Sequence, residues 1–387
     1  MRAMPVPDAS PAIRRVAIEG GRLSVAWAGG GYAEFPFIWL RDNCLCPACR
    51  DPGSGQRLVD VLDLPAAPAA LDAVLAEDAV EIRWAPDGHR SRYEAAWLAA
   101  HDPSPAARAR RRPAPRLWGA EIAADPPEAD WPEVERAPAA ERRALERLFD
   151  YGFLLLRRVP IESGMVTRVG DRIGHVRVTN YGRHFDVVSV PDPSNLAYSA
   201  LALGVHTDNP YRDPTPGLQL LHCLAADAPG GDTILVDGFR AAEDLRREDA
   251  AAFDLLARLP LPFRFADRAA DLRAESPVVT VDVEGRVTGV HFNNRSAAPL
   301  DLPAARIEAW YAAYRRFAAL LRRPEGELRL RLAPGDLLVM QNQRALHGRT
   351  AFDLNAGRRH LQGCYVDKDG VESRLRVLAR AAGGPGR

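Results

Sequence analysis

The sequence predicts a mainly β protein with helices: a small N-terminal β domain followed by a larger β sandwich or barrel that helices decorate. Short runs of strand-forming residues recur from residue 12 almost to the end of the chain, while few stretches have helical periodicity. The sequence also lacks a G-x-G-x-x-G after a strand and a G-x-x-x-x-G-K-[ST] motif. Many strands with few helices therefore favour a sandwich or barrel over a doubly wound sheet.

Length and composition limit the possible functions. The 387 residues suffice for two domains, and a hydrophobic content of 47% is enough for a real core. The 51 basic and 51 acidic side chains cancel, whereas a protein that binds nucleic acid non-specifically usually carries a basic excess. No apolar run approaches the ~18 residues that a membrane span needs, and the polar start of the chain has no signal-peptide core. We expect a cytoplasmic protein with no nucleic-acid or membrane partner.

The small β domain is expected at residues 1–101. Its strand-like runs lie at 16–18, 23–27, 32–35 and 81–84, and Gly-Gly turns separate the first three. Residues 102–120 are rich in Pro, Ala and Arg. Because no aromatic residues are interleaved with these arginines, a linker is favoured over a nucleic-acid patch.

The larger domain is expected at residues 121–387. Residues 141–148 have helical periodicity that stops at Asp150-Tyr151-Gly152, and residues 153–156 follow as a buried strand. Further strands are predicted at 217–223, 233–236, 278–281, 336–340 and 363–366, and further helices at 241–259 and 304–321.

Three of the five cysteines, Cys44, Cys46 and Cys49, fall within six residues. In a cytosolic chain such clustering predicts a metal site before disulfides. A closed tetrahedral zinc site needs a fourth ligand. His89 is the best candidate, because it follows an Asp-Gly turn that could bring its imidazole back to the cysteines. Three reduced thiols without metal are the alternative, and a closed site would be structural because it has no open position.

A histidine and a carboxylate two residues apart, His206 and Asp208, predict a second metal site. In an extended segment residues i and i+2 share one face, so both side chains can reach one point. His347, which follows the predicted strand 336–340, supplies a second imidazole from far along the chain. Two imidazoles and one carboxylate with open positions form the facial triad of non-haem Fe(II) oxygenases. His222 lies in an apolar run and is expected to pack in the core instead.

Such a triad leaves room for a 2-oxo acid to chelate the iron. The far carboxylate of that co-substrate needs a basic partner, ideally a guanidinium. Arg359 begins a segment that could return beside the metal, and Thr233 in Gly230-Gly231-Asp232-Thr233 could offer a hydroxyl.

These motifs together resemble a known family. His206-x-Asp208, His347, Arg359 and the Gly-Gly-Asp-Thr turn resemble the Fe(II)/2-oxoglutarate dioxygenases of the taurine dioxygenase superfamily. The run Trp39-Leu-Arg-Asp-Asn-Cys44-Leu-Cys46-Pro-Ala-Cys49 resembles the N-terminal zinc module of the γ-butyrobetaine and trimethyllysine hydroxylases. The resemblance covers nearly the whole chain, and the combination of both motifs is highly specific.

The resemblance implies a double-stranded β-helix, or jelly-roll, catalytic domain behind a zinc-binding β domain. It implies iron, 2-oxoglutarate and O2 in the reaction, ascorbate as an activator, a structural zinc and a homodimer. The implied ligands are Cys44, Cys46, Cys49 and His89 for zinc, His206, Asp208 and His347 for iron, and Asn195, Thr233 and Arg359 for 2-oxoglutarate.

Family substrates carry a trimethylammonium group, which has no N–H to donate. Aromatic faces select such a cation at ~0.5–2 kcal/mol per ring. The resemblance implies a cage of Tyr181, Phe185, Tyr198 and Tyr365. Asn209 departs from the pattern, because an animal-type family member has a tyrosine there; either Tyr211 replaces that ring or the cage is one ring short.

The substrate's other end is an anion. Asn293 and Asn294 match the family's asparagine pair for the substrate carboxylate, and Arg295 follows them with a full charge, as Arg183 also could. An added arginine suits a dianionic phosphonate better than a carboxylate.

The expected function is hydroxylation of γ-butyrobetaine to L-carnitine, as in carnitine biosynthesis. The alternatives are hydroxylation of 2-(trimethylammonio)ethylphosphonate at the carbon next to phosphorus, and trimethyllysine hydroxylation, for which the sequence shows no α-amino site. A non-enzymatic zinc-module binding protein is the alternative from another class, and the complete triad argues against it.

Overall fold

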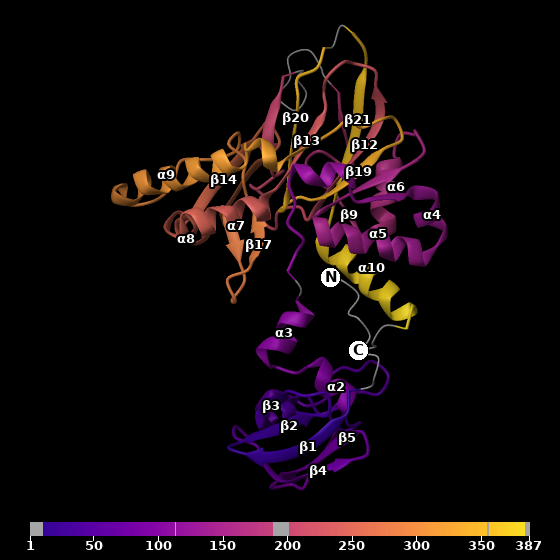
Figure 1. The fold of residues 1–387 in the computed structure, drawn as a ribbon, viewed down its shortest axis with the longest axis vertical. Coiled ribbons are helices and arrows are strands. Elements are labelled where there is room, and N and C mark those ends of the chain that lie inside the picture. Colours follow the sequence, from indigo (N-terminus) through magenta and orange to yellow (C-terminus); the bar gives the residue numbers. More distant parts are fainter. Residues whose placement is uncertain (1–10, 113, 189–200, 354–355, 384–387) are drawn as a thin grey trace. The chain divides into compact units, whose positions relative to one another are not determined.

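The computed structural model describes residues 11–112, 114–188, 201–353 and 356–383 (Figure 1). The chain divides into two compact units, Met1–Ala114 and Pro115–Arg387. The division falls inside the segment 102–120 that the sequence predicts as a linker, and this segment also holds the helix α3 (Pro105–Arg111). Among the described residues no helix is long and apolar enough to cross a membrane.

The first unit is built from two three-stranded antiparallel sheets. One contains β1 (Ile13–Glu19), β2 (Arg22–Trp27) and β3 (Tyr32–Pro36), and the other β4 (Ala69–Ala76), β5 (Ala79–Ala85) and β6 (Arg90–Glu94). The remaining elements are α1 (Phe37–Asp42), η1 (Val61–Asp63), α2 (Ala95–Ala100) and α3. Alternating residues such as Leu23, Val25, Ile82 and Trp84 point into one shared core, as half-buried strands require.

The second unit contains two sheets that share a core, which agrees with the predicted jelly-roll. The larger has seven strands in the order β10-β21-β12-β19-β8-β7, with β9 added to β21, and the smaller has the order β11-β20-β13-β18. Leu221 and Met340 of the larger sheet pack with Leu235 and Leu328 of the smaller. The larger sheet comprises β7 (Glu128–Asp130), β8 (Phe153–Arg157), β9 (Val176–Arg177), β10 (Phe185–Val187), β12 (Leu218–Ala226), β19 (Leu337–Gln341) and β21 (Arg359–Val366), and the smaller β11 (Leu203–His206), β13 (Thr233–Asp237), β18 (Glu327–Leu330) and β20 (Ala345–Arg349).

Helices flank this pair of sheets in two groups (Figure 1). One group covers the outer face of the larger sheet through a cluster that includes Leu218, Leu220 and Val339. The other packs with two hairpins into a separate core around Trp310 and Phe317. The first group is α4 (Trp131–Arg136), α5 (Pro138–Tyr151), α6 (Met165–Ile173) and α10 (Lys368–Ala381). The second group is α7 (Gly238–Glu248), α8 (Ala250–Arg258) and α9 (Ala304–Leu320), with the hairpins β14 (Pro260–Ala266)–β15 (Asp271–Pro277) and β16 (Val279–Val281)–β17 (Val287–Val290). The short helices η2 (Ala120–Ala124) and η4 (Pro324–Gly326) also belong to this unit.

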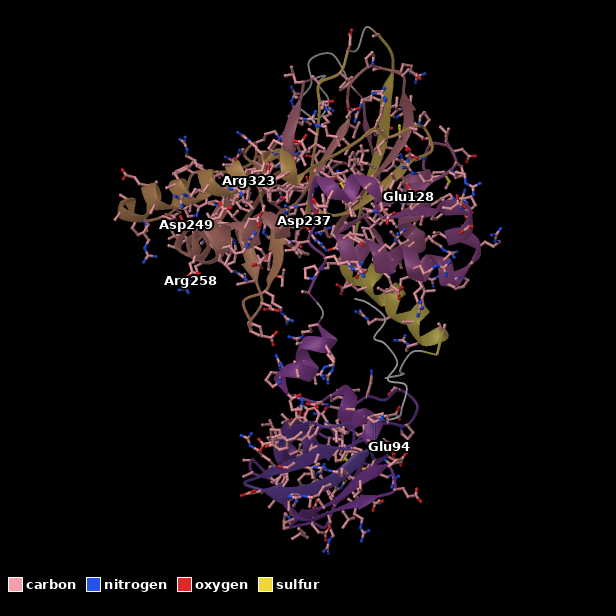
Figure 2. The ribbon with its side chains drawn as sticks, viewed as in Figure 1. Glu94, Glu128, Asp237, Asp249, Arg258 and Arg323 are labelled. Carbon is pink, nitrogen blue, oxygen red and sulfur yellow. The ribbon has the colours of Figure 1, made fainter. Side chains whose placement is uncertain are left out.

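Two predictions about local structure are corrected. The helix predicted at 241–259 is two helices, because the Asp249 carboxylate accepts a hydrogen bond from the Ala252 backbone N–H at 3.0 Å and so caps α8 (Figure 2). His347 follows the strand Leu337–Gln341 as expected, but it lies within a further strand, β20, which the sequence did not predict and which pairs with β11 and β13 on its two sides.

A buried ion pair secures the end of β13 and the start of β20. The Arg344 Nε lies 3.3 Å from Asp237 Oδ1, and the two side chains are 2% and 0% exposed. Asp237 also accepts from the Trp118 backbone N–H at 3.2 Å, while Arg344 donates to the Arg116 carbonyl at 2.6 Å. Because both side chains of the ion pair are buried and make further hydrogen bonds, this network holds the strand that carries His347.

His222 lies in the core, as predicted, and both of its ring nitrogens lack a hydrogen-bond partner among the described residues. Burial lowers its pKa from the ordinary 6.5 to about 4. The unfolded chain therefore binds a proton at this histidine between about pH 6.5 and 4 while the folded protein does not, so stability is lost as the pH falls through this window.

We expect a His222→Leu variant to lose less stability on acidification than the wild type. Between pH 7 and pH 5 the difference in unfolding free energy should grow in favour of the variant by about 2 kcal/mol. Urea unfolding at the two pH values measures this, and His184→Gln, which changes an exposed histidine, is the control. An equal loss in wild type and His222→Leu would contradict the assignment.

Candidate active site

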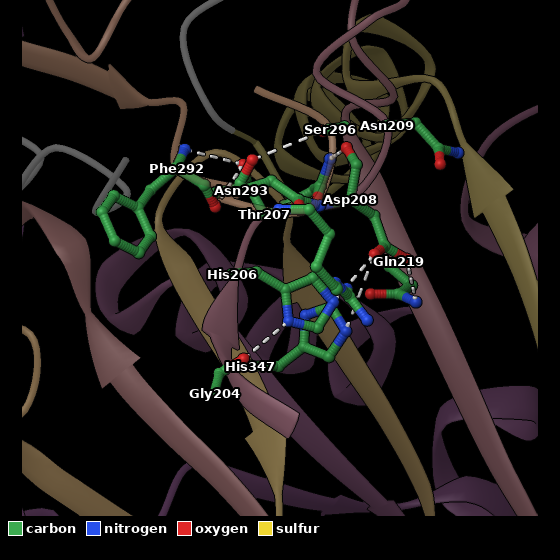
Figure 3. A network of polar contacts seen from close by, with 12 residues as sticks. Gly204, His206, Thr207, Asp208, Asn209, Gln219, Phe292, Asn293, Ser296 and His347 are labelled. Atoms are coloured by element: carbon green, nitrogen blue, oxygen red, sulfur yellow. Dashed lines mark hydrogen bonds and ion pairs between the residues drawn. The ribbon is translucent and has the colours of Figure 1, made fainter. Parts of the chain in front are cut away.

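The pairing of β11 with β20 brings two histidines together. His206 stands directly opposite His347 in the register, with ring centroids 4.4 Å apart. Asp208 Oδ1 lies 3.2 Å from His206 Nε2 and 3.9 Å from His347 Nε2 (Figure 3). One donor atom from each of the three residues lies within 4.8 Å of the others, so the predicted triad is assembled.

Local hydrogen bonds orient these side chains. His206 Nδ1 is 3.0 Å from the Gly204 carbonyl oxygen, which directs Nε2 toward Asp208 (Figure 3). The Asp208 backbone N–H donates to Asn342 Oδ1 at 2.7 Å, and the Asn342 amide donates back to the Asp208 carbonyl at 2.9 Å. Thr207 points away, as predicted, and its hydroxyl accepts from the Phe292 backbone N–H at 3.0 Å.

The electrostatics give the donor set that Fe(II) prefers. Burial opposes ionisation of Asp208, but its hydrogen bond with His206, the positive potential of both imidazoles and the Tyr365 hydroxyl outweigh it, so its pKa lies below the ordinary value. Burial lowers the pKa of His347 to about 3, and the neighbouring His206 adds to this. Two imidazoles and one carboxylate on one face fit a facial-triad iron.

The triad opens onto a cavity of about 470 Å³ that both sheets line. Strand β12 contributes Gln219 and Leu221, β20 contributes His347 and Arg349, and the β14–β15 hairpin contributes Phe265. Its other lining residues are Tyr181, Phe185, Val187, Leu203, His206, Asp208, Asn209, Tyr211, Thr233, Arg264, Ala266, Asn293, Arg295, Ser296, Gly348, Arg359, Leu361 and Tyr365.

One part of this cavity is aromatic. Tyr181 lies 6.0 Å from Phe185 and 5.9 Å from Phe265 between ring centroids, and Phe185 lies 5.3 Å from Tyr365. A side chain at Gly363, the strand partner of Phe185, would come within 2.6 Å of the Phe185 ring, so glycine makes this approach possible. The structure therefore brings together three of the four predicted cage rings, and Tyr198 lies outside the described residues.

Tyr211 lies beside Asn209, which stands where the family pattern has a cage tyrosine. Tyr211 stacks on Phe265 with centroids 5.2 Å apart, and its hydroxyl donates to Asn209 Oδ1 at 2.7 Å. Its oxygen also lies 3.0 Å from the Tyr181 hydroxyl. Asn209 has a φ of 52°, a conformation that asparagine tolerates better than most residues. Sequence reasoning missed Phe265, because nothing in its hairpin's pattern places it beside the cavity.

The two members of the asparagine pair differ in position. Asn293 lines the cavity, and its amide donates to the Thr207 carbonyl at 3.0 Å. Asn294 does not line it: its Oδ1 accepts from the Tyr314 hydroxyl at 2.6 Å on α9, because successive residues of this turn point in different directions. We therefore correct the expectation that Asn294 faces the substrate.

Arg295 lines the cavity as expected, whereas Arg183 does not. The Arg183 guanidinium instead donates to Asp171 at 2.6 Å on α6. Of the two arginines expected for the substrate's anionic end, Arg295 lines the cavity and Arg183 does not, so Arg295 is the remaining candidate.

A second basic region of the cavity combines Thr233, Arg349 and Arg359. Thr233 and Arg349 are register partners across β13 and β20, and the guanidinium groups of Arg349 and Arg359 lie 5.1 and 5.3 Å from the Phe352 ring centroid. Burial and the nearby charges of Arg359 and Arg295 lower the pKa of Arg349 to about 10, and burial also lowers the pKa of Arg359. Two neighbouring cations, the buried Arg349 and the half-buried Arg359, suit a dianion such as a 2-oxo diacid.

The predicted Gly-Gly-Asp-Thr turn contributes to this region. Gly231 has a φ of 71°, and a Cβ there would lie 2.7 Å from Arg359 Nε, which donates to the Gly231 carbonyl at 3.3 Å. Asn195, also predicted for 2-oxoglutarate, lies outside the described residues. Arg349 was not predicted from the sequence. It lies two residues after His347 on one strand, and because residues at that spacing share a face, this spacing could have identified it.

The first unit holds the predicted cysteine cluster. His89 Nε2 lies 3.3, 3.7 and 3.6 Å from the sulfurs of Cys44, Cys46 and Cys49. Ser91 Oγ donates to Cys44 Sγ at 3.0 Å and Arg41 to Cys49 Sγ at 3.4 Å. Burial nevertheless raises the pKa of the Cys44 thiol to about 11, so metal binding would have to displace its proton. Burial lowers the pKa of His89, which keeps the imidazole neutral as a ligand must be. Four donors at these separations fit a closed tetrahedral zinc site.

Comparison with known proteins decides the family. Residues 110–365 match the model of the taurine catabolism dioxygenase TauD, TfdA family, and residues 15–113 match that of the gamma-butyrobetaine hydroxylase-like N-terminal domain. The chain belongs to the TauD/TfdA dioxygenase family. This confirms the predicted family, the mainly β fold, the enzyme class and the cofactors, which are Fe(II), 2-oxoglutarate and a zinc at the Cys3His cluster.

Several TauD/TfdA relatives match almost end to end. The chain is 38% identical to the gamma-butyrobetaine dioxygenase of Pseudomonas sp. strain AK-1, covering 97% of this chain and 98% of the relative. It is 32% identical to the Homo sapiens gamma-butyrobetaine dioxygenase, covering 94% and 96%. The mitochondrial trimethyllysine dioxygenase of Gallus gallus is 34% identical, covering 93% and 89%. A taurine dioxygenase structure from Burkholderia xenovorans aligns with a TM-score of 0.48 and 18% identity over 67% of this chain and 93% of its own.

We expect Cys46→Ser to damage folding of the first unit more than the chemistry of the second. Losing one thiolate should lower zinc content from about one ion per chain to near zero and cost about 3 kcal/mol or more of stability, because structural zinc binding is folding energy. Zinc analysis and thermal unfolding measure this, with Cys364→Ala as the control that removes a thiol outside the cluster. Unchanged stability with lost activity would contradict a structural zinc.

Proposed function

We propose that this TauD/TfdA enzyme hydroxylates a small trimethylammonium acid, γ-butyrobetaine, to L-carnitine with Fe(II) and 2-oxoglutarate. One observation carries the proposal: a single cavity is lined by the metal triad, an aromatic cluster and a cationic region. The similarity to gamma-butyrobetaine dioxygenases over nearly the whole chain supports the same substrate.

Each part of the cavity is assigned one task. We assign iron to His206, Asp208 and His347, and 2-oxoglutarate to Thr233, Arg359 and Arg349 together with Asn195. The hydroxylating power is supplied by iron, 2-oxoglutarate and O2 when bound, which leaves succinate and CO2 beside the product, and ascorbate acts as an activator. The protein's own contribution is to hold the substrate so that one C–H faces the metal.

The aromatic cluster selects the cation. A trimethylammonium group donates no hydrogen bond, so each ring face contributes ~0.5–2 kcal/mol by cation–π attraction. Tyr181, Phe185 and Tyr365, with Tyr198, were expected from the sequence; Tyr211 and Phe265 enlarge the set. Among the described lining residues Asp208 is the only carboxylate, and it belongs to the triad, so the rings carry the recognition.

Asn293 and Arg295 are assigned to the anionic end of the substrate. A cationic end in the aromatic cluster and an anionic end at Arg295 hold a zwitterion at both ends, which restricts its rotation over the triad. A charge-assisted hydrogen bond of this kind contributes ~1.5–3 kcal/mol.

The same residues disfavour trimethyllysine. Its α-ammonium group needs an acceptor, yet the described lining offers no carboxylate beyond Asp208 and places the Arg295 cation near the anionic end. A phosphonate analogue, 2-(trimethylammonio)ethylphosphonate, remains the second candidate, because the full charge of Arg295 suits a dianion.

We further propose that the enzyme is a cytoplasmic homodimer. Cysteine ligands that must stay reduced suit a reducing compartment, and the family resemblance supports the dimer. Light scattering of the purified enzyme tests the dimer.

Purified enzyme with Fe(II), ascorbate and 2-oxoglutarate should convert γ-butyrobetaine to its hydroxylated product with matching succinate. We expect slower turnover of the phosphonate and little of trimethyllysine. His206→Ala should lose product formation because the triad loses a ligand. Succinate without product from γ-butyrobetaine or the phosphonate would overturn the substrate proposal, and activity in His206→Ala would overturn the triad.

Arg295→Leu should lower kcat/KM for γ-butyrobetaine ~10–100-fold, and more for the phosphonate, because a lost charge matters more to a dianion. Steady-state kinetics on both substrates measure this. Arg183→Leu removes the same charge from a residue outside the cavity lining and is the matched control. Equal losses on the two substrates would remove the argument for a phosphonate.

A further inference from the structure

The two oxygens of the Asp208 carboxylate have different surroundings. Oδ1 faces the triad, 3.2 Å from His206 Nε2 and 3.9 Å from His347 Nε2. Oδ2 accepts two hydrogen bonds, from Gln219 Nε2 at 2.6 Å and from the Tyr365 hydroxyl at 2.8 Å (Figure 3 shows the first). One oxygen of the Asp208 carboxylate thus faces the two histidines, and the other accepts hydrogen bonds from two donors.

The two donors come from one place in the fold. Gln219 on β12 and Tyr365 on β21 are direct register partners, and both side chains line the cavity. Side chains directly opposite on neighbouring antiparallel strands lie close enough to act on one atom. The larger sheet therefore reaches across the cavity to Asp208, which follows a strand of the smaller sheet.

We propose that Gln219 and Tyr365 are positioning residues that restrict Asp208 to a single metal-ligating oxygen, Oδ1. A carboxylate whose second oxygen is held by two donors cannot turn both oxygens to an ion. A facial triad must leave positions open for the co-substrate and oxygen, and a two-oxygen Asp208 would occupy one of them. Donors to a ligating carboxylate also fix its orientation.

The surroundings of the Gln219 side chain support this positioning role. Gln219 is 3% exposed, and its Oε1 has no hydrogen-bond partner among the described residues. An unsatisfied buried acceptor costs ~1–3 kcal/mol. An apolar residue would avoid that cost but could not donate to Asp208, so Gln219 favours the metal ligand at the expense of stability.

The ring and the hydroxyl of Tyr365 have different roles, and one substitution distinguishes them. The ring belongs to the aromatic cluster, 5.3 Å from Phe185, while the hydroxyl bonds to Asp208. Tyr365→Phe removes only the hydroxyl. Tyr181→Phe is the matched control, since it removes a hydroxyl in the same cavity that contacts the Tyr211 hydroxyl and, among the described residues, makes no hydrogen bond to Asp208.

The inference rests on the proposed iron triad but not on the proposed substrate, so its test contains no substrate. Full-length, zinc-containing enzyme is titrated with Mn(II), a redox-inert stand-in for Fe(II), and free Mn(II) is followed by electron paramagnetic resonance. Gln219→Leu and Tyr365→Phe should each weaken Mn(II) binding ~10-fold. Tyr181→Phe should bind as the wild type does.

Thermal unfolding without Mn(II) supplies the second measurement. Gln219→Leu should be at least as stable as the wild type, because it loses an unsatisfied buried acceptor. Wild-type Mn(II) affinity in both Gln219→Leu and Tyr365→Phe would overturn the inference, as would an equal loss of affinity in Tyr181→Phe. His206→Ala in the same titration tests the triad itself: unchanged binding there would overturn the iron site and not only its positioning.

Discussion

The register of β11 against β20 is the constraint on which the site depends. It sets His206 opposite His347, and the separate register of β20 against β13 sets Arg349 opposite Thr233. A slip of one residue would turn each of these side chains to the opposite face of its sheet. Strand β20 is secured near its start by the buried Arg344–Asp237 pair, so the metal ligands are positioned by an ion pair that lies outside the cavity lining.

Positively charged side chains outnumber negatively charged ones in the described lining of the cavity. Asp208 is the one carboxylate of the described lining, whereas Arg264, Arg295, Arg349 and Arg359 also line it. Arg264 is neutralised by Asp271 at 2.9 Å, but the pKa of Arg349 is lowered by burial and by two neighbouring arginines. Like charges repel one another, so an anion bound among these arginines would lower the electrostatic energy of the cavity. The proposed dianionic co-substrate and the anionic end of the proposed substrate would supply that charge, while the rings would accept the cation that the arginines would repel.

Local pattern predicted those parts of the site that depend on strand geometry. His206 and Asp208 were found from their spacing, and the cysteines from theirs, because such motifs carry their own geometry. Phe265 was not found, since its position beside Tyr211 arises from packing of a hairpin 54 residues further along the chain (265 − 211). Asn294 was misplaced for the converse reason: adjacency to Asn293 in the sequence did not mean a shared direction in a turn. The break between α7 and α8 coincides with a hydrogen bond that the Asp249 carboxylate accepts from the Ala252 backbone N–H, and this cap outweighs the helical periodicity around it.

The metal region and the aromatic cluster meet in a single residue. Tyr365 has only two rotatable side-chain bonds, and it lies within an eight-residue strand that pairs on both sides near this position. Its ring and hydroxyl are rigidly joined, so the place where a cation rests on the ring is tied to the place where Asp208 is held. A misplacement of about 1 Å between substrate and reactive centre costs a large factor in rate. Because the ring and the hydroxyl belong to one tyrosine, covalent bonds fix the distance between them, and motion of nearby loops does not change that distance.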